Sequence, residues 1–249
     1  MSGHSKWSSI KHKKAAADAK RGKIFSRLGK EITLAAREGG GDPEMNPRLR
    51  TAIDSAKDEN MPNSNIDRAI KKGTGELGGQ QLEEMSYEGY APGGVAIYVS
   101  CLSDNRNRTA ANIRSYFSKH NGNLAENGAV SWMFNRQARF LVKSDDEEKI
   151  LEVLLEAGTE KADTEAADET IEILADPDEF NTIADALREA GVKISESGVE
   201  YVPDNTIEIA EVDTARKIVR MIEEIEEDED VQQVYTNLDL PEDVAEQIT

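Results

Sequence analysis

The hydrophobic periodicity of the chain changes at a glycine-rich segment, residues 73–79. Before this segment, apolar residues recur at steps of three and four, the spacing of amphipathic helices. After it, short apolar runs typical of strands alternate with helical patterns. The first part predicts three helices, one from Asp18 to the glycines at 39–41, one from Asn46 to Asn60 and one from Asn63 to Gly73. We expect these helices to form a small bundle, and residues 73–79 to be a linker.

The second part of the chain contains a repeat. The sequence LLEAG at 154–158 is echoed by LREAG at 187–191, an offset of 33 residues that matches one strand–helix unit. A duplicated unit of this size predicts a β-α-β-β-α-β sandwich. The predicted fold class is therefore α+β, an N-terminal three-helix bundle followed by two ferredoxin-like α+β domains, one inserted in the other. The expected domains are a basic arm and bundle at 1–75, one α+β domain at 80–136 plus 205–249, and an inserted acidic domain at 137–204.

Several elements of this second part can be placed more closely. Residues 170–175 and 231–236 are predicted strands, and Ser144–Glu147 has the spacing of a capping box that opens a helix. Polar residues interrupt two further strand patterns. We therefore expect four short strands there, at 130–134, 139–142, 192–195 and 199–202.

The net charge of −19 conceals an N-terminal part of opposite sign. Residues 1–75 hold 16 Lys and Arg against 9 Asp and Glu, a net charge of +7, whereas residues 144–249 hold 7 against 34, a net charge of −27. This asymmetry predicts a polyanionic partner for the N-terminal part, although a solvated lysine-rich helix is the alternative. The acidic runs from Glu223 to Asp230 are expected to be solvated surface.

The candidate contacts in the N-terminal part are cations and one aromatic residue. On the first helix, most of these cations fall on one stripe opposite Phe25, Leu28 and Ile32, an arrangement that suits contact with a phosphate backbone. Trp7 either stacks on a base or packs on the bundle. The candidates in the arm are Lys6, Trp7, Lys11, His12, Lys13 and Lys14, and those on the helix are Lys20, Arg21, Lys23, Arg27 and Lys30.

A second candidate contact is Arg106–Asn107–Arg108, at the start of a predicted helix. Arginine in a first helical turn opposes the helix dipole, so local stability does not account for these residues. An anion bound at this helix N-terminus would account for them. The alternative is that the two arginines bridge to the acidic part of the chain.

The sequence predicts no catalytic residue, metal site, cofactor or small-molecule substrate. The single cysteine and the three histidines have no ligand or triad spacing, and no nucleophile or phosphate-loop motif occurs. Gly73–Gly78 is formally a G-x-G-x-x-G, but it follows a predicted helix, whereas the dinucleotide fingerprint follows a strand.

No apolar run is long enough for a membrane helix, and no secretory signal opens the chain, so we expect a cytoplasmic protein with no membrane partner. Aromatic residues make up 5%, which favours sheets that act as scaffolds rather than base-stacking platforms.

Three segments resemble the YebC family, which includes the mitochondrial translational activator of cytochrome oxidase subunit I. They are residues 3–32 (GHSKWSSIKHKKAAADAKRGKIFSRLGKEI), 56–75 (AKDENMPNSNIDRAIKKGTG) and 87–109 (YEGYAPGGVAIYVSCLSDNRNRT). The resemblance implies three domains and a non-enzymatic, cytoplasmic role in gene expression. Members are labelled probable transcriptional regulators that bind DNA, and others are placed at the ribosome as translation factors. The family motifs map onto Gly3–Trp7 and Asp104–Thr109.

The sequence and the resemblance together predict a non-enzymatic nucleic-acid-binding regulator. Its ligand is DNA or ribosomal RNA, and in the second case the ribosome is its partner. The alternative is a protein-interaction module whose acidic part docks basic ribosomal or polymerase proteins.

Overall fold

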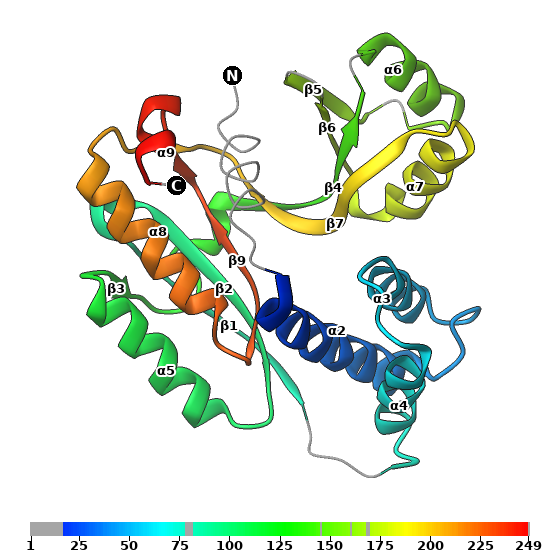
Figure 1. Ribbon diagram of the computed structural model, residues 1–249, viewed down its shortest axis with the longest axis horizontal. Coiled ribbons are helices and arrows are strands. Elements are labelled where there is room, and N and C mark those ends of the chain that lie inside the picture. Colours follow the sequence, from blue (N-terminus) through cyan, green and yellow to red (C-terminus); the bar gives the residue numbers. More distant parts are fainter. Residues whose placement is uncertain (1–16, 78–81, 145, 160, 168–169, 249) are drawn as a thin grey trace.

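The computed structural model describes residues 17–77, 82–144, 146–159, 161–167 and 170–248 (Figure 1). A bundle of helices and two sheets, each with helices on one face, are arranged around a central cleft. In this part of the chain, no helix combines the length and the apolar character needed to cross a bilayer.

Three helices form the N-terminal bundle, α2 (Ala17–Gly39), α3 (Pro47–Asp58) and α4 (Asn63–Gly73). Asn46 caps α3 as predicted, because its side chain accepts the Leu49 N–H at 3.1 Å. The Asn46 amide also donates to the carbonyls of Ala35 and Gly40 at 2.8 Å each, which fixes the start of α3 against the end of α2. Gly73 allows α2 and α4 to approach closely, since a Cβ there would lie 2.3 Å from the Thr33 carbonyl oxygen.

The sheet of residues 134–203 has the predicted β-α-β-β-α-β order. Its elements are β4 (Phe134–Lys143), α6 (Glu147–Glu156), β5 (Asp163–Ala167), β6 (Thr170–Ala175), α7 (Phe180–Glu189) and β7 (Lys193–Pro203). The antiparallel strands lie in the order β5-β6-β4-β7, the ferredoxin-like arrangement, and α6 and α7 cover one face over a core that includes Phe140 and Ile183. The repeated segments LLEAG and LREAG end these helices. Their glycines, Gly158 and Gly191, have φ angles of 78° and 70°, a left-handed conformation that favours glycine over other residues.

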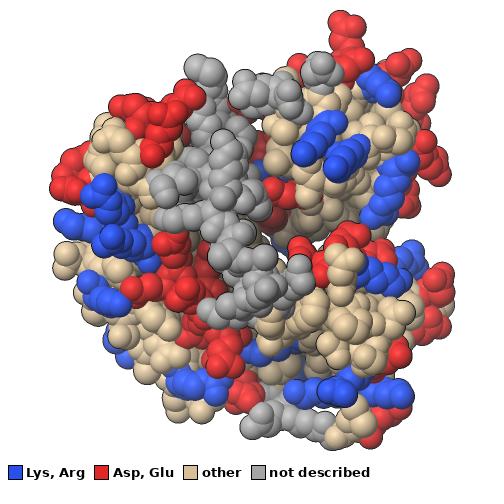
Figure 2. All heavy atoms as spheres, viewed as in Figure 1, with Lys and Arg blue, Asp and Glu red and all other residues tan. Residues whose placement is uncertain are grey.

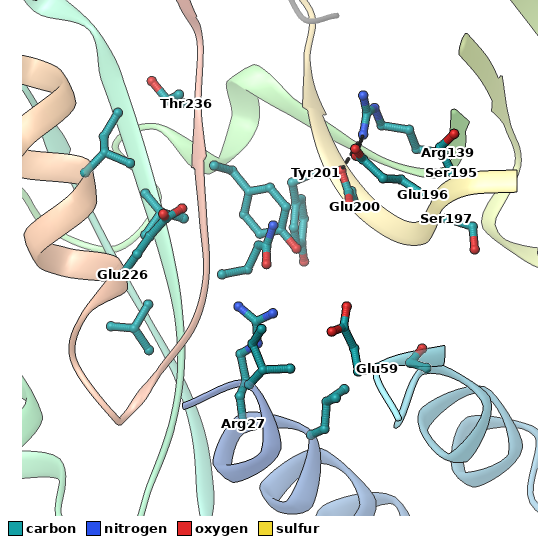
Figure 3. Close-up of a pocket in the computed structure, with 18 of the residues that line it drawn as sticks. Arg27, Glu59, Arg139, Ser195, Glu196, Ser197, Glu200, Tyr201, Glu226 and Thr236 are labelled. Carbon is teal, nitrogen blue, oxygen red and sulfur yellow. Dashed lines mark ion pairs between the residues drawn. The ribbon is translucent and has the colours of Figure 1, made fainter. Parts of the chain in front are cut away.

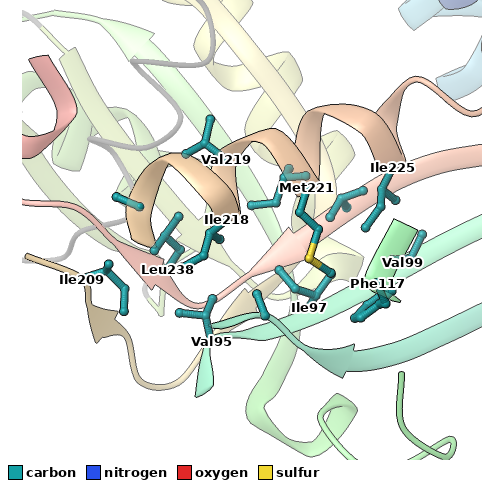
Figure 4. Close-up of a cluster of buried hydrophobic side chains, with 14 of the residues drawn as sticks. Val95, Ile97, Val99, Phe117, Ile209, Ile218, Val219, Met221, Ile225 and Leu238 are labelled. Atoms are coloured by element: carbon teal, nitrogen blue, oxygen red, sulfur yellow. The ribbon is translucent and has the colours of Figure 1, made fainter. Parts of the chain in front are cut away.

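The other four-stranded sheet takes strands from both sides of residues 134–203. It consists of β1 (Glu83–Tyr90), β2 (Ala96–Ser103), β3 (Asn123–Leu124) and β9 (Val231–Thr236), in the antiparallel order β3-β1-β2-β9. Helices α5 (Arg106–Lys119) and α8 (Val212–Glu226) cover one face around Ile97, Phe117 and Met221 (Figure 4). Both sheets have four antiparallel strands and two helices on one face. In this sheet, however, a hairpin through η1 (Pro92–Gly94) joins the central strands, and α8 and β9 follow residues 134–203 in the chain.

Small elements complete this part of the molecule. A short parallel pair, β8 (Ile207–Glu208) and β10 (Leu238–Asp239), lies outside the main sheets, and α9 (Glu242–Ile248) packs on the α8 core. A 3₁₀ turn, η2 (Ser131–Met133), precedes β4, and another, η3 (Pro177–Glu179), precedes α7. The described fold is α+β, as the sequence predicted.

Three predicted boundaries were wrong. Residues 131–133 form η2, so β4 begins only at Phe134 and then continues without a break to Lys143. Strand β7 is also continuous, because its polar residues Glu196 and Glu200 face Arg139 of β4 on the side of the sheet away from the helices. Asp146, rather than Ser144, caps α6 by accepting the Lys149 N–H at 3.0 Å.

Candidate functional site

The predicted N-terminal contacts divide into three groups. Lys6, Trp7, Lys11, His12, Lys13 and Lys14 lie outside the described residues. Lys20, Arg21 and Lys23 lie in the first two turns of α2, where the structure describes the backbone alone. Arg27 and Lys30 follow on the same helix with described side chains.

Arg27 faces the start of β9, and Lys30 faces the loop between α8 and β9. Arg27 Nη1 donates to the Gln232 carbonyl at 3.1 Å. Lys30 Nζ donates to the Glu229 carbonyl at 2.6 Å and to the Asp230 carboxylate at 3.1 Å. The middle of the predicted cationic stripe therefore holds the bundle against the α+β part of the molecule.

Asp230 is the centre of this junction. Its side chain is buried, and it accepts hydrogen bonds from Arg108 Nη2 at 2.7 Å, Thr109 Oγ1 at 2.9 Å and Lys30 Nζ at 3.1 Å. Burial alone would raise the pKa of Asp230, but the hydrogen bonds from Arg108, Lys30 and Thr109 hold this pKa below its ordinary value. Asp230 is therefore an ionised carboxylate that connects α2, α5 and the α8–β9 loop.

The structure corrects the interpretation of Arg108. Its anion is Asp230 of the same chain, so Arg108 does stabilise the fold, as the alternative interpretation held. Asn105 caps α5 by accepting the Arg108 N–H at 3.1 Å. Arg106 and Asn107 are exposed, and among the described residues Arg106 forms no salt bridge.

The acidic run after α8 is not simply solvated surface. Asp228 is 9% exposed and Asp230 2%. Asp228 accepts from Asn112 Nδ2 at 2.8 Å and from the Tyr116 hydroxyl at 3.1 Å. Burial and the neighbouring Asp228 carboxylate raise the pKa of Tyr116 to about 12. The expectation of a wholly solvated acidic run was wrong because two of its carboxylates bind the facing side of α5, which sequence periodicity does not reveal.

The central cleft has a volume of about 1530 Å³ and lies between α2, α3, β7, α8 and β9. Figure 2 shows acidic side chains gathered around the middle of this face, and Figure 3 shows side chains from these elements directed into the cleft. Among the residues that the structure describes, three arginines line it, Arg27, Arg139 and Arg188. Ten acidic residues of the described part also line it, Asp58, Glu59, Glu172, Glu196, Glu200, Glu223, Glu226, Glu227, Asp228 and Glu229.

A tyrosine cluster joins the two four-stranded sheets at this cleft. Tyr98 of β2, Tyr201 of β7 and Tyr235 of β9 have ring centroids 4.9 Å (98–201) and 5.3 Å (201–235) apart. Tyr201 and Tyr235 line the cleft. Burial and the nearby Glu200 raise the pKa of Tyr235, so this phenol is neutral at physiological pH. The low aromatic content gave no sign of the cluster, because its members come from three distant strands.

Arg139 forms the most buried ion pair of the cleft wall. Its Nε lies 2.5 Å from Glu172 Oε1, and its Nη1 lies 3.5 Å from Glu196 and 3.7 Å from Glu200. Burial alone would lower the pKa of Arg139, but these carboxylates raise it. Arg139 is therefore a fixed cation whose charge is already met by neighbouring carboxylates.

Cys101 is the single cysteine of the chain. The Cys101 thiol is buried, and burial raises its pKa to about 12, so it is not a thiolate at neutral pH. In the part of the chain that the structure describes, His, Cys, Asp and Glu form no group of three or more that could hold a metal ion.

Comparison with known proteins places these features in one family. Residues 5–76 match the model of the TACO1/YebC protein N-terminal domain, and residues 82–238 match that of the TACO1/YebC second and third domain. A protein of Halothermothrix orenii is 53% identical over all of this chain and 99% of its own length, and one of Syntrophus aciditrophicus is 52% identical over the full length of both. Both are named probable transcriptional regulatory protein.

A solved structure is also similar. The crystal structure of the conserved hypothetical protein Aq1575 from Aquifex aeolicus is 48% identical, covers 94% of this chain and 96% of its own, and superposes with a TM-score of 0.83. The matched domains, the full-length relatives and this structure agree over nearly the whole sequence. The chain belongs to the TACO1/YebC family.

Proposed function

We propose that this protein is a non-enzymatic, cytoplasmic regulator of gene expression that binds nucleic acid through its N-terminal cations. The observation that carries the proposal is the run of cations that precedes Arg27 in the sequence. Arg27 contacts β9 and Lys30 contacts the α8–β9 loop. Seven cations lie between Lys6 and Lys23, and Asp18 is the one acidic residue in this stretch of the sequence. The name of the relatives, probable transcriptional regulatory protein, supports a regulatory role.

Phosphate backbones are the natural ligand of such a stretch. Each lysine or arginine that neutralises a phosphate releases condensed counterions, which supplies affinity without reading sequence. The acidic cleft repels phosphate within a screening length of about 8 Å at physiological salt. Nucleic acid is therefore expected along the outer side of the first turns of α2 rather than in the cleft.

The start of α5 provides a second contact on the same side. Lys30 of α2 and Arg108 of α5 bind the same Asp230 carboxylate, so the start of α5 lies beside the middle of α2. Arg106 and Asn107 are exposed there, next to the N–H groups of a helix N-terminus. We expect these two residues to contact phosphate, while Arg108 holds Asp230 and keeps half of its side chain exposed.

The test uses charge-matched variants of the full chain. Lys20→Gln, Arg21→Gln and Lys23→Gln together should weaken nucleic-acid binding at least about tenfold at physiological salt, because three phosphate contacts are lost. The control replaces three exposed lysines elsewhere, Lys149, Lys193 and Lys217, with Gln and changes the net charge equally. An equal loss in both variants would mean that net charge, rather than this stretch, governs binding.

Crosslinking in cells, followed by sequencing of the bound nucleic acid, distinguishes the two ligand classes. Recovery of ribosomal RNA supports a translation factor, whereas recovery of genomic DNA supports a transcriptional regulator. The second candidate function, an acidic module that docks basic proteins, is favoured by the ten carboxylates of the cleft. It predicts partner binding that survives the Lys20, Arg21 and Lys23 changes.

A further inference from the structure

The central cleft lies beside the sheet faces that the helices leave open, and residues of α8 and α7 also line it. On β2, Ile97 and Val99 face the α5–α8 core, so the alternating Tyr98 points to the opposite side. On β4, Phe140 faces the α6–α7 core and Arg139 points to the opposite side, toward Glu196 and Glu200 of β7. Helices α2 and α3 close the third side (Figure 3).

The lining of this cleft suits a cationic polypeptide. Among the described lining residues, ten carboxylates outnumber three arginines, and they remain in excess after Arg139 has paired with Glu172, Glu196 and Glu200. This excess attracts Lys and Arg side chains, and the faces of Tyr201 and Tyr235 favour cations through their π electrons. The volume of about 1530 Å³ exceeds the roughly 300–1,000 Å³ of most small-molecule sites. An extended polypeptide segment fits both the size and the charge.

We propose that the cleft is the docking site for residues 1–16 of the same chain when no nucleic acid is bound. This segment carries Lys6, Lys11, Lys13 and Lys14 and no acidic residue. Helix α2 begins at Ala17, and Gly22 and Ile24 in its first turns line the cleft, so the segment joins the molecule at the rim.

The length of residues 1–16 and their effective concentration at the cleft both favour this segment as the bound polypeptide. Sixteen extended residues span up to roughly 50 Å. A short tether also gives the segment a millimolar effective concentration at the cleft, which an external basic peptide does not reach.

The docked segment competes with nucleic acid, an inference that rests on the proposed function. Lys6, Lys11, Lys13 and Lys14 cannot neutralise phosphates while they lie among the carboxylates of the cleft. The apparent affinity for nucleic acid then equals the intrinsic affinity multiplied by the fraction of molecules whose segment is undocked. The acidic cleft thus limits binding to ligands with enough phosphates to displace the segment.

Trp7 reports on docking without any nucleic acid. The chain has two tryptophans, so Trp132→Phe leaves Trp7 as the sole fluorophore of its kind. In this background, Glu59→Gln, Glu223→Gln and Glu226→Gln remove three cleft charges. The control Glu148→Gln, Glu152→Gln and Glu156→Gln removes three exposed charges from α6, outside the cleft.

We expect the cleft variant to shift Trp7 emission to the red and to raise acrylamide quenching by at least about twofold as the docked population falls. The control should match the parent. Lys13→Gln with Lys14→Gln, which leaves the core untouched, should reproduce the change, and its combination with the cleft variant should add little. Unchanged emission in both variants overturns the docking proposal. A response that depends on protein concentration overturns the intramolecular form, because a second copy would then supply the segment.

Nucleic-acid affinity separates this proposal from the proposed function. The cleft variant should bind an oligonucleotide about two- to tenfold more tightly at low salt, and the control should bind like the parent. If Trp7 responds but no nucleic acid binds, docking stands and the proposed function fails. If nucleic acid binds but neither Trp7 emission nor affinity responds to the cleft charges, the proposed function stands and docking fails.

Discussion

Asp230 shows how one buried carboxylate can connect elements that are far apart in the sequence. Lys30 reaches it from α2, and Arg108 and Thr109 reach it from α5. Without this carboxylate, the Lys30 ammonium would lie at the loop with only carbonyl partners at 2.6 and 3.3 Å. Removing one member of a buried pair costs more than the pair contributes, because the remaining charge stays desolvated.

Replacing Asp230 with Asn should therefore lower the free energy of unfolding by about 1–3 kcal/mol at pH 7, below the cost for a fully buried pair because Arg108 is half exposed. The folded-state pKa of Asp230 is depressed. Its stabilisation is thus complete above the unfolded pKa of about 3.9 and is lost as the pH falls through the folded pKa. Denaturant unfolding at pH 7 and pH 3 should show a smaller difference for D230N than for wild type.

The control for this prediction is Asp185→Asn, which removes an exposed i,i+3 partner of Arg188. We expect a change within about 0.5 kcal/mol for the control, the usual value for a surface pair. If D230N and D185N behave alike, the junction at Asp230 contributes no more than a surface ion pair.

Substitutions of Arg106 and Arg108 should have different effects on the free energy of unfolding in the same assay. Arg108→Ala should cost about 1–2 kcal/mol of unfolding free energy, because Asp230 loses its shortest hydrogen bond. Arg106→Ala should stay within about 0.5 kcal/mol, as expected for an exposed side chain, but should weaken nucleic-acid binding. Equal stability losses would show that Arg106 also braces the fold.

The helix-dipole argument favoured a bound anion at the start of α5, whereas the anion beside Arg108 is Asp230 of the same chain, as the alternative interpretation held. Sequence alone does not say which anion. Asp230 lies 122 residues further along the chain than Arg108, and no local pattern connects them. Arg106 shows no such partner among the described residues, so the same argument leaves it available for an external ligand.

Elements were predictable where one side of a strand or helix is apolar and the ends carry turn residues. The strands at 170–175 and 231–236 have the predicted bounds, and the LLEAG and LREAG repeats end α6 and α7 as expected. Strand β7 was predicted as two pieces because Glu196 and Ser197 interrupt its apolar pattern. Those residues face the cleft, and a polar sheet face looks like a turn when the partner strand is unknown.

Close helix packing gives a prediction at the level of elements. Gly73→Ala places a Cβ 2.3 Å from the Thr33 carbonyl oxygen and 2.7 Å from the Ala36 Cβ, so α2 and α4 must move apart. We expect a loss of about 1–3 kcal/mol in unfolding free energy, as for other overpacked sites. Gly29→Ala in α2 meets no atom within 4 Å and should instead stabilise by up to about 1 kcal/mol through helix propensity. Thermal unfolding of both variants tests this contrast, and a stabilised G73A would contradict it.

For the whole molecule, the division into a basic N-terminal part and an acidic remainder was evident from charge counts. Their arrangement was not, because it depends on which carboxylates the folded chain turns inward. Asp230 is buried at a junction, Asp228 is buried and also borders the cleft, and Glu59, Glu223 and Glu226 line the cleft. Tyr98, Tyr201 and Tyr235 come together only when both sheets have formed. A sequence pattern shows which face of a single helix or strand is apolar. It does not show a cleft between three packed units, because the cleft depends on how those units contact one another.

The salt dependence of nucleic-acid binding measures how many cations make contact. If the seven cations from Lys6 to Lys23 each neutralise one phosphate, log K should fall with log salt with a slope of about −6 on duplex DNA and about −5 on single strands. Arg27 and Lys30 are not expected to add to this number because they bond to β9 and to the α8–β9 loop, respectively.

Lys13→Gln with Lys14→Gln should make the duplex slope shallower by about 1.8, while Lys149→Gln with Lys193→Gln should leave it unchanged. Docking in the cleft also weakens with salt, because it too is an attraction between opposite charges. Rising salt thus frees the segment while it weakens phosphate contacts, and the parent slope should be shallower than that of the Glu59, Glu223 and Glu226 variant. Binding titrations from low to physiological salt test both statements. A flat response, or a slope insensitive to Lys13 and Lys14, would mean that nucleic acid does not bind through these cations.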